Sequence, residues 1–255
     1  MIIDAHEERL LVVSDLHLGS PASSAERRLV GFLDHAASIG ASVCINGDGF
    51  DLLQSSFSRL VRASLPVLSK LRKVQEAGGN VHYVVGNHDL VLEHFLQHVL
   101  VFQMAPFLNV RSGGRRIRVE HGHIYDPFYS RFPRVYGVAG RAFGMTMFVH
   151  KDFYKVWSTM ADAVDRHRRR RADGVLELSP HHRAAEMLLD RGFDAVVFGH
   201  THHAELVELP SGTYVNSGTW MHAGSYVDID HGEVTLRTWA HEPARAAVAV
   251  AEADG

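Results

Sequence analysis

The sequence predicts a fold of the α/β class from two observations. Short apolar runs rich in β-branched residues recur along the chain, and each ends in glycine and polar side chains. Between these runs lie segments whose apolar residues recur at helical spacing. Strands that alternate with helices indicate βαβ units and a sheet with mixed or parallel strands.

The length of 255 residues, with 46% hydrophobic residues, predicts one large domain or one domain with an insertion. The single cysteine, Cys44, excludes a disulfide framework and cysteine-based zinc sites, and we expect it in the core. The N-terminal residues lack the pattern of a secretory signal, and no run of about 18 apolar residues could span a membrane. We therefore expect a cytoplasmic protein.

Strands and helices are expected in alternation through the first part of the chain. The apolar runs predict strands over residues 10–14, 42–46, 81–85 and 194–198. Helical spacing predicts helices over residues 22–39, 58–77, 90–100 and 179–191. We expect an interruption of the second helix near Pro66, because proline lacks a backbone N–H. Ser179 as N-cap and Pro180 at the first helical position mark the start of the fourth.

The last part of the chain predicts antiparallel hairpins. Turn residues separate short strands over residues 204–209, 213–216, 225–230 and 233–239. Residues 241–255 are rich in alanine and show no pattern of a packed element, so we expect a loose tail there. Residues 1–240 are then expected to form a single domain.

Residues 124–178 interrupt the alternation of strands and helices, and we interpret them as a helical insertion. Between residues 115 and 171 there are 13 Lys and Arg against 5 Asp and Glu, whereas the rest of the chain has 13 against 24. Residues 125–157 also hold 10 of the 23 aromatic residues. Basic charge beside aromatic surface favours a partner that is anionic and apolar or stackable. The alternatives are an ordinary core or dimer interface for the aromatic stripe, and a solvated charge run or a nucleic-acid contact for the arginines.

Five short polar motifs stand at or just after expected strand ends, where α/β sheets gather their ligand sites. They are Asp15-Leu16-His17, Gly47-Asp48, Gly86-Asn87-His88-Asp89, His121-Gly122-His123 and Gly199-His200-Thr201-His202. Each motif alone also fits an ordinary turn. Together they place oxygen and imidazole donors, without thiolate, at several strand ends. That mixture of donors suits Mn²⁺, Fe²⁺ or Zn²⁺.

Spacing supports the metal interpretation of two motifs. Residues two apart on an extended chain point the same way, so Asp15 and His17 can share one cation, as can His200 and His202. A glycine before Asp48 allows close backbone approach, and the two oxygens of one carboxylate can bridge two cations.

The order D-x-H, GD, GNHD, a lone histidine and then GHTH resembles the calcineurin-like metallophosphoesterase superfamily, from Asp15 to His202. The resemblance implies a four-layer αββα sandwich with two divalent metal ions, of which Mn²⁺ is the first choice. It also implies two ligand sets that share Asp48. These sets are Asp15, His17, Asp48 and His202 for one metal, and Asp48, Asn87, His121 and His200 for the other.

The same resemblance implies metal-assisted hydrolysis of a phosphoester. His88, hydrogen-bonded to Asp89, would then protonate the leaving group or stabilise charge in the transition state. His123 competes with His121 for the ligand role. The remaining histidines, His181 and His182 among them, have no paired spacing at a strand end and are interpreted as structural or surface residues.

A narrower resemblance, to the UDP-2,3-diacylglucosamine diphosphatases of lipid A synthesis, rests on SDLHLG, GDGFD and the aromatic-basic insertion before GHTH. It implies that residues 124–178 form a lid around acyl chains at an anionic membrane surface, with release of UMP and a lipid monophosphate and no nucleic-acid partner. Substrate contacts would come from His123, Tyr125, Arg131, Phe153, Trp157 and His203. Asn216 is expected near the rim of the site.

The chain departs from the diphosphatase pattern at three places. It has His88 where those enzymes usually have arginine, His123 where they have aspartate, and NSGTW at residues 216–220. The alternative function is therefore a broad-specificity phosphodiesterase or nucleotide phosphatase whose insertion is a dimerisation element.

Overall fold

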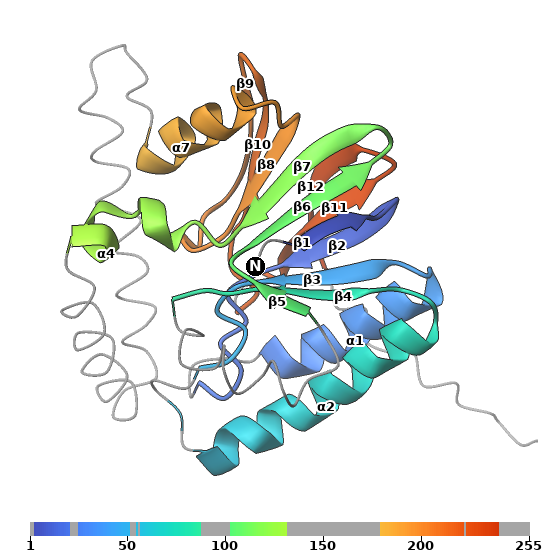
Figure 1. Ribbon diagram of the computed structural model, residues 1–255. Coiled ribbons are helices and arrows are strands. Elements are labelled where there is room, and N and C mark those ends of the chain that lie inside the picture. Colours follow the sequence, from blue (N-terminus) through green and yellow to red (C-terminus); the bar gives the residue numbers. More distant parts are fainter. Residues whose placement is uncertain are drawn as a thin grey trace, which may run out of the picture.

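The computed structural model describes residues 3–20, 25–51, 55, 57–87, 103–131, 179–221 and 223–239. Two six-stranded sheets stack against each other, and helices cover their outer faces (Figure 1). The predicted α/β class is confirmed. The insertion beyond residue 131, the expected helix over 90–100 and the expected tail over 241–255 lie outside the described residues.

The first sheet has the strand order β12-β11-β2-β3-β4-β5. Its strands are β2 (Arg9–Val13), β3 (Ser42–Asn46), β4 (Val81–Val84), β5 (Gln103–Ala105), β11 (Ser225–Asp230) and β12 (Glu233–Thr238). Strands β2 to β5 are parallel to one another, and β11 joins β2 in the antiparallel sense. Every residue of β3 and β4 is buried, as expected for parallel strands covered on both faces.

The second sheet has the strand order β1-β6-β7-β8-β10-β9. Its strands are β1 (Ile3–His6), β6 (Phe107–Ser112), β7 (Arg115–Glu120), β8 (Ala195–Phe198), β9 (Ala204–Leu209) and β10 (Gly212–Ser217). β8 lies between β7 and β10 and is parallel to both. The two predicted hairpins, β9–β10 and β11–β12, are confirmed, and each completes the edge of a different sheet.

Four strands lie outside the strand ranges that the sequence analysis gave: β1, β5, β6 and β7. β5 has three residues, too few to show a period. β6 alternates buried and more exposed residues, with Leu108 and Val110 facing the other sheet, and it pairs with β1 and β7. Its strand character comes from these pairings more than from its composition.

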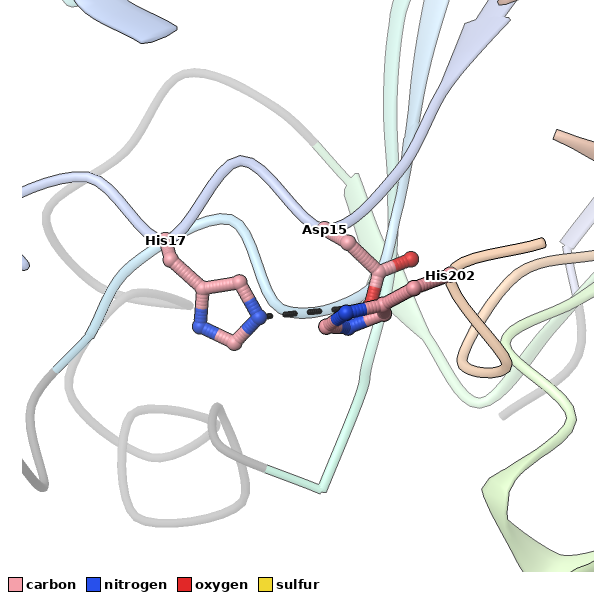
Figure 2. Close-up of side chains that lie close together, drawn as sticks. All are labelled: Asp15, His17 and His202. Atoms are coloured by element: carbon pink, nitrogen blue, oxygen red, sulfur yellow. Dashed lines mark ion pairs between the residues drawn. The ribbon is translucent and has the colours of Figure 1, made fainter. Parts of the chain in front are cut away.

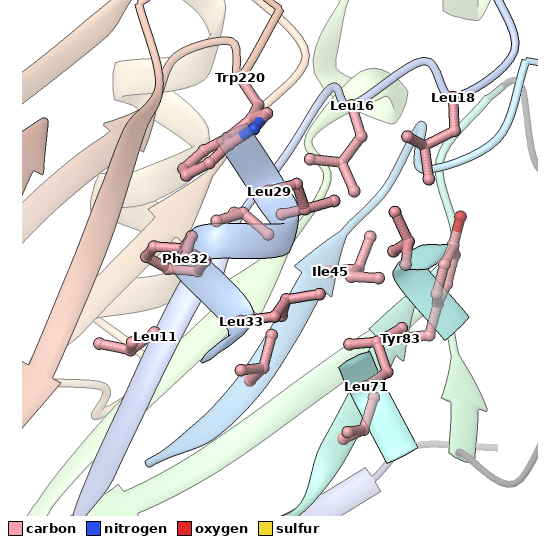
Figure 3. Close-up of a cluster of buried hydrophobic side chains, with 14 of the residues drawn as sticks. Leu11, Leu16, Leu18, Leu29, Phe32, Leu33, Ile45, Leu71, Tyr83 and Trp220 are labelled. Carbon is pink, nitrogen blue, oxygen red and sulfur yellow. The ribbon is translucent and has the colours of Figure 1, made fainter. Parts of the chain in front are cut away.

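Helices α1 (Ala25–Ser38) and α2 (Phe57–Glu76) pack against each other and cover the first sheet (Figure 1). Leu29 and Phe32 of α1 meet Trp220 in the core beneath them (Figure 3). Lys70 of α2 donates to the carboxylate of Asp34 over 2.6 Å and links the two helices.

The expected interruption near Pro66 is wrong, because α2 runs continuously through this residue. A proline inside a helix costs about 3 kcal/mol. On the inner face of α2, Val67, Leu71 and Val74 are buried in the core, and each such side chain contributes about 1.5–3 kcal/mol. Burial of this face therefore outweighs the missing hydrogen bond.

Helix α7 (Pro180–Leu189) covers β8 and β10 of the second sheet. The Ser179 hydroxyl accepts a hydrogen bond from the backbone N–H of His182, so the predicted N-cap is confirmed.

Between β7 and the end of the described insertion lie a 3-10 turn, η1 (His123–Tyr125), and the short helix α4 (Pro127–Arg131). Among the helices of the described ranges, none is long and apolar enough to cross a membrane.

Candidate metal centre

Four loops that follow strands of both sheets meet at one edge of the sandwich. The Asp15 amide donates to the carbonyl oxygen of Gly47 over 3.1 Å, which joins the loops after β2 and β3. The Gly199 amide donates to the carbonyl oxygen of His121 over 3.1 Å, which joins the loops after β8 and β7. The polar motifs of the sequence therefore lie together, at the carboxyl ends of strands that are parallel or adjacent.

A first group of donors consists of Asp15, His17 and His202, whose ligand atoms lie within 4.8 Å of one another (Figure 2). His202 Nε2 is 3.0 Å from Asp15 Oδ1, and His17 Nε2 is 4.0 Å from the same oxygen. Asp15 and His17 leave the end of β2, whereas His202 follows β8 of the other sheet. Donors from both sheets thus converge in this group.

A second group consists of Asp15, Asp48 and His121, all of them buried. Asp48 Oδ2 lies 3.4 Å from His121 Nε2 and 3.9 Å from His17 Nε2. One carboxylate oxygen is therefore close to imidazoles of both groups.

Two other predicted ligands lie beside these groups. The His200 ring centre is 5.3 Å from that of His121, and the backbone N–H of His200 donates to Asp15 Oδ2 over 3.2 Å. The Oδ1 atom of Asn87 is buried and makes no hydrogen bond within the described part of the chain. His88 and Asp89 lie outside the described residues.

The predicted substrate residues lie in different settings. The His123 ring centre is 5.6 Å from that of His121 and 4.9 Å from that of Tyr129. Tyr125 stacks on Phe198 and donates its hydroxyl to Glu120 over 3.1 Å. Arg131 and His203 are exposed, whereas Phe153 and Trp157 lie outside the described residues.

The backbone at the site is strained. Six non-glycine residues of the described ranges have a positive φ, and five of them are predicted ligands: Asp15, His17, Asp48, His200 and His202. This conformation costs roughly 1–2 kcal/mol per residue for a side chain with a Cβ atom. Such strain clusters at functional sites, where the surrounding structure holds it in place.

Two glycines next to predicted ligands are required by close packing. A Cβ atom on Gly47 would overlap the His121 ring, and a Cβ atom on Gly86 would overlap the Asp48 carboxylate. The expected close backbone approach before Asp48 is confirmed. These contacts also bring the loop that carries Asn87 against Asp48.

The end of β10 and the loop after it support the backbone of the site. Asn216 is fully buried and donates its side-chain amide to the carbonyl oxygen of Gly199 over 2.8 Å. The Thr219 hydroxyl donates to the carbonyl oxygen of Asp15 over 3.3 Å. The expectation that Asn216 lies at the rim of the site is therefore wrong, because its amide is consumed by backbone partners in the core.

The carboxylates and imidazoles shift one another's pKa values. Burial opposes the charged form of His121, but the carboxylates of Asp48 and Asp15 outweigh burial and raise its pKa to about 10. Burial likewise opposes ionisation of Asp15, but His202 and His121 lower its pKa to about 2. The two residues thus favour opposite charges, as expected where imidazoles surround a carboxylate.

Two residues near these groups were missed by sequence analysis. His181, from the first turn of α7, has its ring centre 6.1 Å from that of His200, and burial lowers the pKa of His181 to about 4. Asp126 Oδ2 lies 3.0 Å from His200 Nε2. Neither has paired spacing with a predicted ligand, so no local pattern could reveal them.

The donors fit a divalent metal. His121 Nδ1 lies 2.8 Å from the carbonyl oxygen of Asn46, which can only accept, so in the neutral ring Nδ1 carries the proton and Nε2 has the lone pair. Nε2 is buried, and no described residue forms a hydrogen bond with it. Carboxylate, imidazole and amide donors without thiolate match the expected preference for Mn²⁺, Fe²⁺ or Zn²⁺.

Comparison with known families decides the class of this site. The family model described as calcineurin-like phosphoesterase matches residues 8–204. The chain belongs to the calcineurin-like phosphoesterase family. Relatives of the chain are named as hydrolases.

Three curated relatives carry the name UDP-2,3-diacylglucosamine hydrolase, among them the following two. The protein from Porphyromonas gingivalis is 27% identical over 140 residues, which cover 53% of this chain. In this alignment the chain spans 52%, about half, of the length of the relative. The protein from Azotobacter vinelandii is 25% identical over 236 residues, which cover 86% of this calcineurin-like phosphoesterase and 94% of the relative.

Solved structures also resemble the chain. An archaeal phosphodiesterase superposes with a TM-score of 0.49 at 14% identity, over 90% of this chain and 99% of that one.

Proposed function

We propose that this calcineurin-like phosphoesterase is a dinuclear-metal phosphohydrolase that cleaves the diphosphate of UDP-2,3-diacylglucosamine to UMP and a lipid monophosphate. The observation that carries the dinuclear part is the position of Asp48, whose Oδ2 atom is close to both His17 and His121. The names of the two curated relatives support the substrate.

The proposal assigns the predicted ligands to two overlapping sets that share Asp48. One metal would be held by Asp15, His17, Asp48 and His202, and the second by Asp48, Asn87, His121 and His200. When bound, two such cations, Mn²⁺ for preference, lower the pKa of a water molecule and polarise the phosphoryl oxygens.

The remaining residues have roles that follow from their positions. His88, supported by Asp89, is proposed to give a proton to the leaving group. His123, packed beside His121 and over Tyr129, is proposed to contact the phosphate. The Tyr125 hydroxyl already donates to Glu120, so we propose that Tyr125 shapes the wall of the site through its ring.

The insertion is proposed to form a lid that recognises the acyl chains. Phe153 and Trp157 would sheathe the chains, and Arg131 with the run over residues 166–171 would meet phosphates or an anionic membrane surface. The protein would then act at the inner face of the membrane without spanning it.

The second candidate is a broad-specificity phosphodiesterase or nucleotide phosphatase whose insertion mediates dimerisation. The departures at His88 and His123 from the diphosphatase pattern favour it.

Hydrolysis by metal-stripped protein reloaded with Mn²⁺ separates the two candidates. The substrates are UDP-2,3-diacylglucosamine and bis-p-nitrophenyl phosphate, and Asp48→Ala is the inactive control. Preferred cleavage of the acylated substrate with release of UMP supports the first candidate, and activity on the small diester alone supports the second. If Asp48→Ala keeps full activity on both substrates, both candidate functions are contradicted.

Variants of the insertion test the lid. Phe153→Glu and Trp157→Glu are expected to impair cleavage of the acylated substrate and to spare the small diester. Met187→Glu, which adds the same charge at an exposed apolar residue of α7, is the matched control. An equal loss of both activities in folded Phe153→Glu and Trp157→Glu would show that the stripe does not serve acyl recognition.

A further inference from the structure

Asp126 joins the start of the insertion to a predicted metal ligand. Its Oδ2 atom lies 3.0 Å from His200 Nε2, although 74 residues separate the two in the sequence. Its Oδ1 atom accepts a hydrogen bond from the backbone N–H of Tyr129 over 3.3 Å, at the beginning of α4. The side chain is half-buried, with 27% of its surface exposed. Each carboxylate oxygen therefore has a partner, and the two contacts together fix the orientation of the Asp126 carboxylate.

The contact determines which nitrogen of His200 carries the proton. A carboxylate oxygen can only accept, so Nε2 is the protonated nitrogen of the neutral ring. Nδ1 is then the nitrogen whose lone pair can be given to a cation. Metal-binding histidines are commonly oriented by a carboxylate on the other ring nitrogen, which fixes the tautomer and raises the basicity of the ligand.

We propose that Asp126 is a positioning residue that orients His200 for binding of the second metal ion through Nδ1. This inference rests on the proposed function, because it takes His200 as a ligand of that metal. It differs from the ligand assignment itself, since Asp126 would contact neither metal nor substrate.

The segment around Asp126 has anchors of its own. Tyr125 stacks on Phe198, with ring centres 5.4 Å apart, and its hydroxyl donates to Glu120. The Tyr125 amide donates to the carbonyl oxygen of Gly122 over 3.1 Å. These contacts do not involve the Asp126 carboxylate, so removing it is expected to leave the turn η1 in place.

The test compares metal binding by four variants of the full chain. Asp126→Ala removes the contacts of the carboxylate with His200 and with the Tyr129 amide. Asp126→Ser can still cap α4, because serine is a good N-cap, but its side chain is too short to replace the contact with His200. Asp126→Asn keeps an acceptor oxygen. Asp230→Ala is the matched control, because Asp230 is also partly exposed and lies 2.8 Å from a histidine, His231, in the β11–β12 turn.

Titration calorimetry with Mn²⁺ and Mn²⁺ electron paramagnetic resonance are the readouts. We expect Asp126→Ala and Asp126→Ser to bind the second Mn²⁺ about 10–100-fold more weakly and to lose the signal of a coupled metal pair. Asp126→Asn should recover part of the affinity, and Asp230→Ala should match the unmodified protein. The melting temperature of the metal-free variants should change little.

The outcomes separate this inference from the proposed function. If the unmodified protein binds two coupled Mn²⁺ ions and Asp126→Ala binds them equally well, the positioning role is wrong and the dinuclear proposal stands. If Asp126→Ser binds Mn²⁺ like the unmodified protein, Asp126 affects metal binding through the cap of α4 and not through its contact with His200. Binding of fewer than two Mn²⁺ ions by the unmodified protein would contradict the dinuclear proposal itself.

Discussion

The side-chain amide of the fully buried Asn216 donates a hydrogen bond to the carbonyl oxygen of Gly199 over 2.8 Å. The Oδ1 atom of the same side chain accepts from the Gly218 amide over 3.0 Å. One buried asparagine thus ties the loop after β10 to the backbone from which His200 and His202 project. Thr219 reaches the carbonyl oxygen of Asp15 from the same loop, so loops of both sheets share this support.

Replacement of Asn216 by alanine should destabilise the protein and weaken metal binding. Asn216→Ala leaves buried backbone groups without partners, which costs about 1–3 kcal/mol. Urea unfolding of the metal-free protein and Mn²⁺ titration are the measurements. Asn109→Ala is the control, because Asn109 also makes two side-chain hydrogen bonds but lies half-buried in the middle of β6, in the second sheet. Equal losses in the two variants would show that Asn216 has no special part in holding the loops.

Gly47→Ala should damage the site beyond the effect of backbone strain. Gly47 has a φ of 78°, and a Cβ atom there would overlap the His121 ring. Gly78→Ala is a close control, because Gly78 has a φ of 93° and open space where a Cβ atom would lie. We expect Gly78→Ala to cost about 1 kcal/mol and Gly47→Ala to cost more than about 3 kcal/mol. Similar unfolding free energies would contradict the packing argument.

Mn²⁺ should stabilise the fold, because metal binding to the native state shifts the unfolding equilibrium. At a free concentration 100-fold above Kd, the gain is about 2.7 kcal/mol. Thermal melts with increasing Mn²⁺ measure it, and EDTA should reverse it. Asp48→Ala should abolish most of the shift, whereas Asp34→Ala, which removes an acidic residue that pairs with Lys70 and Lys73, should retain it. A full shift in Asp48→Ala would exclude Asp48 as a ligand.

Glu7 should contribute a stability that depends on pH. Burial alone would raise its pKa, but hydrogen bonds from His82, Ser42 and Asn80 outweigh burial and hold the pKa below the ordinary value of 4.5. Ionised Glu7 therefore stabilises the fold above pH 4.5, and this contribution is lost as the pH falls through the folded-state pKa.

Glu7→Gln is the variant that tests this dependence. It should unfold more easily than the unmodified protein at pH 7, by about 1–3 kcal/mol, and the difference should shrink as the pH falls toward 3. Urea unfolding of both proteins across this range is the measurement. A difference that stays constant with pH would show that hydrogen bonding alone, without the charge of Glu7, explains the effect.

Much of the fold could be predicted from local sequence. The strands β2, β3, β4 and β8 are apolar runs that need no partner to be identified, and the Ser179 cap of α7 has a local signature. β1, β5 and β6 could not be found in this way, because short strands of mixed polarity acquire their structure from the strands beside them. The predicted interruption at Pro66 is wrong for a similar reason, because burial of the inner face of α2 outweighs the low helix propensity of proline.

The candidate site also has features that the sequence predicts and features that only the tertiary structure sets. Residue type and spacing, together with the family resemblance, predicted the donors Asp15, His17, Asp48, His121 and His202, and the structure brings these five together. Asp126, His181 and the buried state of Asn216 depend on contacts between segments far apart in the chain. No local pattern encodes which distant carboxylate meets a given imidazole. Only packing of the two sheets decides that, because it places the loops after β2, β3, β7 and β8 at one edge.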